Sequence, residues 1–407
     1  RKTTFREAHM NRWREDTRYI FRPPKYSPFL APVLYLLSDI LFLRAKNRVI
    51  GVKAVSGSET LRRLYREGHA ILLTPNHSDH CDPHSLIHLA RKYRMPMHFM
   101  AAREVFERKK GINGFLLQRA GAFSIDRESS DMRSIKEAMR ILKEGSYPLV
   151  MFPEGEIYHL NAKLTPLNEG SATLALRTAG TLEKEKSPRK VFIVPTAMKY
   201  TYVDDISVTF PDRLARLENR ISWAPQTHMG IVDRIYKFGE AALSLKEKEY
   251  LDTTLDGTLH ERLNAFRETL VAREEENYLG EKGSGSHPAR IRKLRGKIRS
   301  ILLDGEKPPE NVIRECYRSL DRLFLAVQLY SYPGQYLRHD PSMDKIAETL
   351  LKLEEDTFNQ TFIRGRRTVE ITFCEPVNVS QHAGSRSKTM ASRITSMVES
   401  AIKEILE

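Results

Sequence analysis

The stretch that decides the fold is Ala70-Ile-Leu-Leu-Thr-Pro-Asn-His-Ser-Asp-His-Cys-Asp-Pro-His84. It begins with a short apolar run of the kind that forms a buried strand, and Thr74-Pro-Asn76 ends that run. Asp82 followed by Pro83 predicts a helix start, because aspartate caps free N–H groups and proline lacks the N–H that would stay unpaired there. We therefore expect His77 on a loop between a strand and a helix.

A histidine at this position is a candidate catalytic residue. Open α/β sheets place their functional loops at the carboxyl ends of strands. Asp82 follows His77 by five residues and can orient its imidazole ring. The pattern predicts that His77 is a general base held by Asp82.

Outward from this stretch, short apolar runs alternate with segments of helical spacing. The predicted strands are 70–74, 97–101, 121–126, 148–152 and 191–199. The predicted helices are 83–93, 112–119, 131–144 and 170–184. This alternation predicts an α/β fold with a mixed, mostly parallel central sheet flanked by helices.

After residue 200 the pattern becomes long, charged and helical, and a strand pattern returns only near residue 368. We interpret this as a long all-helical insertion before the last strand. The predicted divisions are an N-terminal segment (1–48), an α/β domain (49–205), the insertion (206–365) and the final strand and helix (366–407).

The N-terminal segment is basic over residues 1–25 and apolar over 27–43. The apolar part contains Asp39 and is shorter than the ~20 residues that a spanning helix needs. We predict an interfacial helix that dips into one leaflet, with flanking cations that meet anionic head groups. The alternative is a helix docked on the protein's own core.

Composition narrows the partners and the compartment. The 407 residues include 66 Lys and Arg against 52 Asp and Glu, a net charge of +14, which indicates an anionic partner such as nucleic acid, lipid head groups or a phosphorylated substrate. The three cysteines, Cys81, Cys316 and Cys374, give neither a disulfide framework nor zinc spacing. They favour a reducing, cytoplasmic location.

Four short blocks follow strand ends in order. They are Asn76-His77-x4-Asp82, Gly121 to Arg127, Phe152-Pro-Glu154-Gly155, and Val194-Pro-Thr-Ala197. Together they resemble the glycerolipid acyltransferase family, the enzymes that acylate glycerol-3-phosphate and lysophosphatidic acid. The later Phe373-Cys-Glu-Pro376 is similar to that family's closing strand, with Cys374 in place of glycine.

The resemblance implies an O-acyltransferase in which His77 deprotonates the acceptor hydroxyl and Asp82 stabilises the imidazolium. It implies that Arg127 binds phosphate, that Glu154 and Gly155 help to fix the acceptor, and that Arg103 is a further candidate cation. No metal or other cofactor is implied.

The implied partners are acyl-CoA or acyl carrier protein as the thioester co-substrate, a glycerolipid acceptor, and a membrane surface with anionic lipids, without nucleic acid. The implied location is the cytoplasmic face of a membrane, with peripheral attachment.

One departure from the family pattern concerns the acceptor. The family usually continues Glu-Gly-Thr-Arg-Ser, whereas this chain has Glu154-Gly-Glu-Ile-Tyr-His159. An acid and an apolar residue therefore replace a threonine and a cation near the expected acceptor phosphate. The departure leaves the acceptor open.

Two other functions compete with this interpretation. A metal-dependent hydrolase would use the histidines and acids of the cluster at 77–88, although the His-Glu-x-x-His order of metalloproteases is absent. A non-enzymatic module that binds membranes or nucleic acid would use basic helices such as 290–299. No helix-turn-helix, zinc-finger or RNA-binding aromatic signature supports the nucleic-acid alternative.

Overall fold

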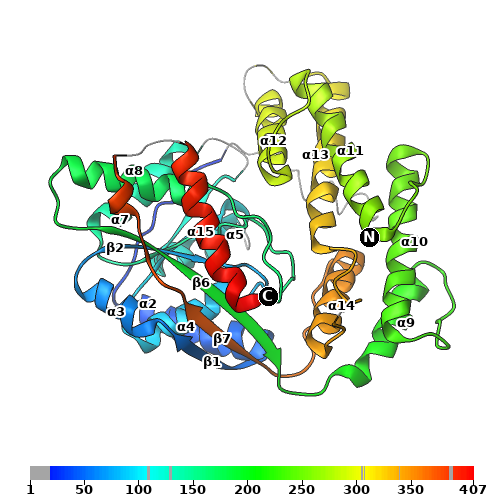
Figure 1. Cartoon of the computed structure of the whole chain (residues 1–407), viewed down its shortest axis with the longest axis horizontal. Helices are drawn as coiled ribbons and strands as arrows, with labels where there is room; N and C mark the ends of the chain where they lie inside the picture. The colour runs from blue at the N-terminus through cyan, green and yellow to red at the C-terminus, as the bar shows by residue number, and fades with distance from the viewer. Residues whose placement is uncertain are drawn as a thin grey trace. The chain divides into compact units, whose positions relative to one another are not determined.

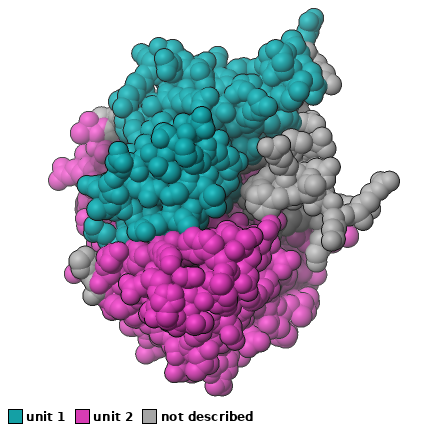
Figure 2. All heavy atoms as spheres, turned by 90° about the vertical axis from the view of Figure 1, so that its right-hand side faces the viewer, with its two compact units in different colours: residues 1–20, 126–131, 239–336 teal, residues 21–125, 132–238, 337–407 magenta. Residues whose placement is uncertain are grey.

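The computed structural model describes residues 19–107, 111–127, 131–303, 306, 308–338, 340–384 and 388–407. The chain divides into two compact units, coloured separately in Figure 2. Unit 2 consists of Phe21–Ile125, Met132–Phe238 and Leu337–Glu407. Unit 1 is mainly Gly239–Tyr336, with two short pieces that include Ile20 and Arg127. Each unit is described by itself.

Unit 2 is built on an eight-stranded sheet with the order β1-β7-β6-β2-β5-β3-β4, and β8 pairs with β6. The strands are β1 (Val49–Ser56), β2 (Ala70–Pro75), β3 (His98–Ala102), β4 (Ala122–Ile125), β5 (Leu149–Val150), β6 (Val191–Tyr202), β7 (Arg367–Phe373) and β8 (Val377–Asn378). Only the β6–β7 and β6–β8 pairs of this sheet are antiparallel. The predicted α/β fold with a mixed, mostly parallel sheet is confirmed.

Helices cover both faces of this sheet (Figure 1). Ala70 and Leu72 of β2 join a core with α7 (Met132–Glu144), α8 (Gly170–Lys184) and α15 (Lys388–Leu406). Ile71 and Leu73 join the opposite core with α2 (Ala31–Leu37), α3 (Ser58–Arg66) and α4 (Asp82–Lys92). Because β2 is buried on both sides, its sequence is continuously apolar and does not alternate.

The helices α5 (Arg103–Glu107), α6 (Ile112–Arg119), α9 (Phe210–Arg220) and α14 (Met343–Phe358) complete unit 2. Both α9 and α14 come from the segment that the sequence assigned to the insertion. Arg213 of α9 donates hydrogen bonds to both carboxylate oxygens of Glu354 on α14, at 3.2 and 2.9 Å, and both residues are buried. β1 is an edge strand that the sequence analysis did not predict.

Unit 1 is helical and has its own apolar core. Its helices are α11 (Leu259–Leu279), α12 (His287–Leu303), α13 (Glu310–Gln328) and all but the first turns of α10 (Ile231–Leu251). Phe266, Leu294 and Leu323 lie at the centre of that core. The basic stretch 290–299 forms most of α12, where Arg290 is buried and ion-paired with Glu268 and Glu275.

The apolar N-terminal segment folds as α2 followed by the π-helix η1 (Ser38–Lys46). Its inner side packs on the sheet unit through Ala31, Tyr35 and Leu43. The buried Asp39 carboxylate accepts hydrogen bonds from His88 and Arg91 of α4. The outer side exposes large apolar side chains: Phe29, Val33, Leu36, Leu37, Ile40, Leu41 and Phe42. None of the helices in the described residues has the length and apolar character that crossing a bilayer requires.

Candidate active site

The sheet brings two of the sequence blocks together. β2 and β5 are parallel neighbours, with Leu73 opposite Val150. The loop that follows β2 carries His77, and the loop that follows β5 carries Glu154. Because parallel strands end at the same edge of a sheet, these loops lie side by side at its carboxyl edge.

His77 and Asp82 form the expected pair. Nδ1 of His77 lies 2.9 Å from Oδ2 of Asp82, which is fully buried at the start of α4. The same Oδ2 accepts a hydrogen bond from the Asp79 N–H at 3.0 Å. The His77 ring stacks on Phe152 with 4.1 Å between centroids, and 15% of its side chain is exposed. The imidazole is thus held on one side and open to solvent on another.

Glu154 fixes the backbone beside His77. Its Oε1 accepts the His77 N–H at 2.5 Å, and its Oε2 accepts hydrogen bonds from the Thr165 N–H, at 3.2 Å, and hydroxyl. Burial raises the pKa of Glu154, while the hydrogen bonds from Thr165 and His77 act in the opposite direction. In this arrangement Glu154 positions His77, and contact between Glu154 and an acceptor stays a prediction.

Gly155 follows with a left-handed backbone (φ 82°). A Cβ at this position would lie 3.0 Å from Nδ2 of Asn168. That same amide donates to the carbonyls of Pro153 and Glu154. The turn therefore requires a residue without a side chain, and a direct role of Gly155 at the acceptor stays a prediction.

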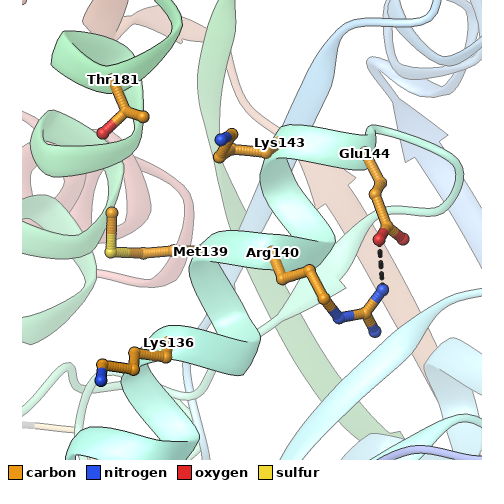
Figure 3. A pocket seen from close by; sticks show the side chains of 6 residues that line it. All are labelled: Lys136, Met139, Arg140, Lys143, Glu144 and Thr181. Atoms are coloured by element: carbon orange, nitrogen blue, oxygen red, sulfur yellow. Dashed lines mark hydrogen bonds and ion pairs between the residues drawn. The ribbon is translucent and has the colours of Figure 1, made fainter.

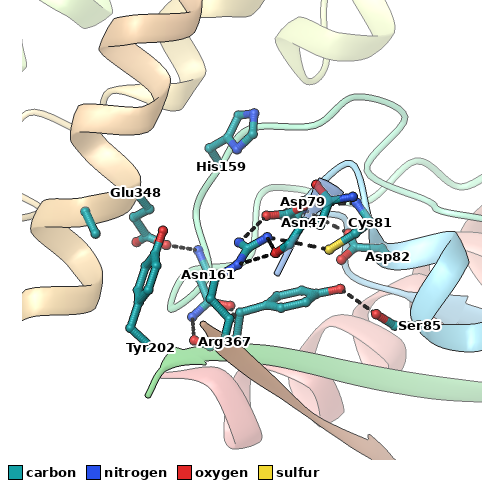
Figure 4. A network of polar contacts seen from close by, with 12 residues as sticks. Asn47, Asp79, Cys81, Asp82, Ser85, His159, Asn161, Tyr202, Glu348 and Arg367 are labelled. Carbon is teal, nitrogen blue, oxygen red and sulfur yellow. Dashed lines mark hydrogen bonds and ion pairs between the residues drawn. The ribbon is translucent and has the colours of Figure 1, made fainter. Parts of the chain in front are cut away.

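A buried ion pair that sequence reasoning missed joins Asp79, in the loop that carries His77, to Arg367 of β7 (Figure 4). Nη1 of Arg367 donates to Oδ2 of Asp79 at 2.6 Å, and Oδ1 of Asp79 accepts the Cys81 N–H at 2.9 Å. Arg367 also donates to the Asn47 carbonyl and lies over the Tyr200 ring. Burial raises the pKa of Asp79, but the Arg367 guanidinium outweighs it and holds that pKa well below its usual value.

A signal for Arg367 exists in the sequence. Along β7, residues 367, 369, 371 and 373 are buried while those between them are more exposed. The apolar Val369, Ile371 and Phe373 therefore mark the inward face, and Arg367 shares that face. An arginine in the inward register predicts a buried anionic partner.

The two predicted phosphate-binding cations are placed differently. Arg103 begins α5, is buried, and its Nε lies 3.6 Å from the Glu107 carboxylate. Arg127 follows β4 and groups with unit 1, whereas His77 belongs to unit 2. Phosphate binding by either arginine stays a prediction.

The histidines of the cluster at 77–88 turn to different partners. His84 hydrogen-bonds Ser38 and stacks on Phe42, while His88 binds Asp39, so both fasten the N-terminal segment to α4. His80 instead contacts Glu355 of α14. The hydrolase alternative requires these histidines and His77 to surround one metal position, but their side chains contact separate partners.

A surface hollow between α7 and α8 is lined by Lys136, Met139, Arg140, Lys143, Glu144 and Thr181 (Figure 3). Within it, Arg140 is ion-paired with Glu144. None of the residues predicted for catalysis or substrate binding lines this hollow.

Part of the chain is similar to known proteins. Residues 53–199 match the family model described as Acyltransferase. The chain is 37% identical over 65 residues to a 1-acyl-sn-glycerol-3-phosphate acyltransferase of Streptococcus pneumoniae (strain ATCC BAA-255 / R6), covering 16% of this chain and 24% of that protein. It is 37% identical over 79 residues to the protein of that name in Bacillus subtilis (strain 168), covering 19% and 37%.

The chain thus spans between a quarter and two fifths of the length of these curated relatives. The matched family segment holds β2 to β6 with the His77–Asp82 pair and Glu154. Residues 53–199 are therefore similar to acyltransferase domains, and the curated relatives that match are of the glycerolipid acyltransferase type.

Proposed function

We propose that this protein is a peripheral membrane acyltransferase. It moves a fatty acyl group from a CoA or carrier-protein thioester to a hydroxyl of a glycerol-phosphate or lysophospholipid-like acceptor, at the cytoplasmic face of a membrane. The observation that carries the proposal is the His77–Asp82 pair, 2.9 Å apart, at the carboxyl edge of the sheet. The names of the curated relatives supply the acceptor class.

The geometry supports a direct transfer between two bound substrates. With Nδ1–H of His77 donated to Asp82, Nε2 carries the lone pair and accepts the proton of the acceptor hydroxyl. The acceptor oxygen attacks the thioester carbonyl and forms the ester. The C–S bond breaks, and the thiolate leaves with the proton that His77 returns. Asp82 stabilises the imidazolium between these two proton transfers.

Supporting residues shape the site around this pair. Glu154 holds the His77 backbone, and Phe152 holds the ring by stacking. Arg127 and Arg103 are the proposed phosphate ligands, because a guanidinium makes bidentate contacts with phosphate.

The N-terminal segment supplies the membrane contact in this proposal. Its exposed apolar side chains lie along α2 and η1, and Arg44 and Lys46 stand in the last turn of η1. An apolar face next to cations suits the boundary between acyl chains and anionic head groups.

The test is a thioester-release assay with acyl-CoA and acyl carrier protein donors over a panel of lyso-acceptors. We expect His77→Ala to lower kcat/KM about 10²–10⁴-fold, the range attributed to positioned acid–base catalysis. Asp82→Asn should also lower kcat, because an amide does not stabilise the imidazolium.

His228→Ala is the matched control, since His228 is an exposed histidine on another loop. Equal turnover by wild type and His77→Ala would refute the assignment of His77 as the base. Release that requires no acceptor would point to hydrolysis instead of transfer.

A further inference from the structure

Three side chains that the proposed mechanism does not use converge beside the active site. They are His80 of the His77 loop, His159 of the loop that follows Glu154 and Gly155, and Glu355 of α14. All three belong to unit 2. Each offers one donor atom, and the three donor atoms lie within 4.8 Å of one another.

The separations suit donors around one ion. Nε2 of His80 lies 3.1 Å from Oε1 of Glu355, and Nε2 of His159 lies 2.8 Å from Oε2. Two donors on one tetrahedral zinc ion, each ~2.0–2.1 Å from the metal, are about 3.3 Å apart. Both histidine–glutamate separations are therefore close to coordination geometry, and the third separation in the trio, of at most 4.8 Å, has to shorten when an ion binds.

His159 is buried beside the Glu355 carboxylate. Its side chain is 3% exposed, and its Nε2 makes no well-aligned hydrogen bond among the described residues although Oε2 of Glu355 is near. A buried polar nitrogen without an aligned partner costs free energy. A cation bound between the two groups would accept a lone pair from each of them.

We propose that His80, His159 and Glu355 bind a divalent transition-metal ion, with Zn²⁺ as the best fit. Two imidazoles and one carboxylate are a ligand set that zinc uses in tetrahedral sites, with a fourth position for water. The His80 side chain is 47% exposed, which gives the ion a path from solvent.

This site shares His80 with the hydrolase cluster that the sequence suggested, but His77 and Asp82 are not among its ligands. The family match covers His80 and His159 but ends before Glu355. His159 also lies in the loop that departs from the family pattern after Gly155. The bound ion would tie α14, which is outside the matched domain, to the two loops that carry His77 and Glu154. The proposal does not rest on the proposed function.

The test measures metal binding by the full-length protein, without turnover. After dialysis against a chelator, the protein is titrated with Zn²⁺ by calorimetry and with Co²⁺ by visible absorption. We expect one equivalent of Zn²⁺ and the intense visible bands of four-coordinate Co²⁺. His80→Ala and Glu355→Gln should each abolish both signals, and removal of the ion should lower the Tm of wild type but not of these two variants.

Two matched variants control for the site and for the fold. His77→Ala, in the same loop as His80, should keep the equivalent of Zn²⁺, and so should His228→Ala at an exposed position. His80 is exposed, so His80→Ala leaves the core intact, and its circular dichroism should match wild type. Absence of stoichiometric binding by wild type would overturn the proposal. Retention by His80→Ala or Glu355→Gln, or loss in His77→Ala, would overturn it as well.

Discussion

At the scale of single residues, the side chains of Asn76 and Glu154 fix the backbone around His77 by hydrogen bonds. The Asn76 side chain is buried and bonds to the backbone of β6. Its amide accepts the Met198 N–H at 2.7 Å and donates to the Met198 carbonyl at 3.0 Å, which continues the pairing of β2 with β6 beyond the last strand residue. The residue before His77 is therefore fixed to β6, and the backbone N–H of His77 donates to the Glu154 carboxylate.

The buried Arg367–Asp79 pair gives the sharpest residue-level prediction. Arg367→Met removes the guanidinium and leaves the Asp79 carboxylate, in the loop that carries His77, buried without a cation. We expect a loss of about 3–5 kcal/mol in the free energy of unfolding, the cost of breaking a buried pair from one side. Denaturant unfolding followed by circular dichroism measures it.

The neighbouring residue provides the control. Arg366 makes a comparable ion pair with Asp204, but its side chain is 59% exposed. Arg366→Met should leave the unfolding midpoint almost unchanged, because water and salt screen an exposed pair. If the two variants lost equal stability, burial would not be the cause of the Arg367 effect.

At the scale of elements, the N-terminal segment is compatible with both alternatives from the sequence, a helix docked on the core and an interfacial helix. Its inner side is docked on the core through Tyr35 and Leu43, as one alternative expected. Its outer side leaves Phe29 and Leu41 92% and 52% exposed. Only the outer side is available for the interfacial helix of the other alternative.

The double variant Phe29→Ser/Leu41→Ser tests membrane contact by this outer side. Burying one large apolar side chain contributes about 1.5–3 kcal/mol, so losing one or both contacts should weaken binding to anionic phospholipid vesicles by at least tenfold. Vesicle flotation measures the bound fraction.

Val208→Ser is the control, because Val208 is 77% exposed but lies outside the N-terminal segment. It should bind vesicles like wild type. Unchanged flotation of the double variant would exclude the outer side as the membrane contact.

At the scale of the whole molecule, the two units have separate hydrophobic cores. Separate cores predict that unfolding departs from a single two-state transition. Leu294→Ala, in the core of unit 1, and Leu72→Ala, in β2 of unit 2, should each cost about 2–5 kcal/mol in their own unit.

Differential scanning calorimetry distinguishes the outcomes. We expect each variant to shift a different part of the heat-absorption profile. A single peak that both variants shift equally would show that the units unfold together.

The sequence by itself determined the features that depend on local chemistry. The apolar run of β2, its end at Thr74-Pro-Asn76 and the helix start at Asp82-Pro83 are encoded within a few residues, so the loop that carries His77 could be placed in advance. The ordered blocks also predicted the acyltransferase match of residues 53–199, because each block keeps its spacing along the chain. The predicted ends of several strands differ from the observed ones, and the edge strand β1 was not predicted.

Only the tertiary structure decided the contacts between distant parts of the chain. Asp79 and Arg367 are separated by 288 positions, and His80 and Glu355 by 275. No local pattern encodes such a pair, since its free energy arises only when folding brings the two side chains together and, for Asp79 and Arg367, also removes both from water. The histidines at 80, 84 and 88 look alike in the sequence, and the fold alone gave each a different partner.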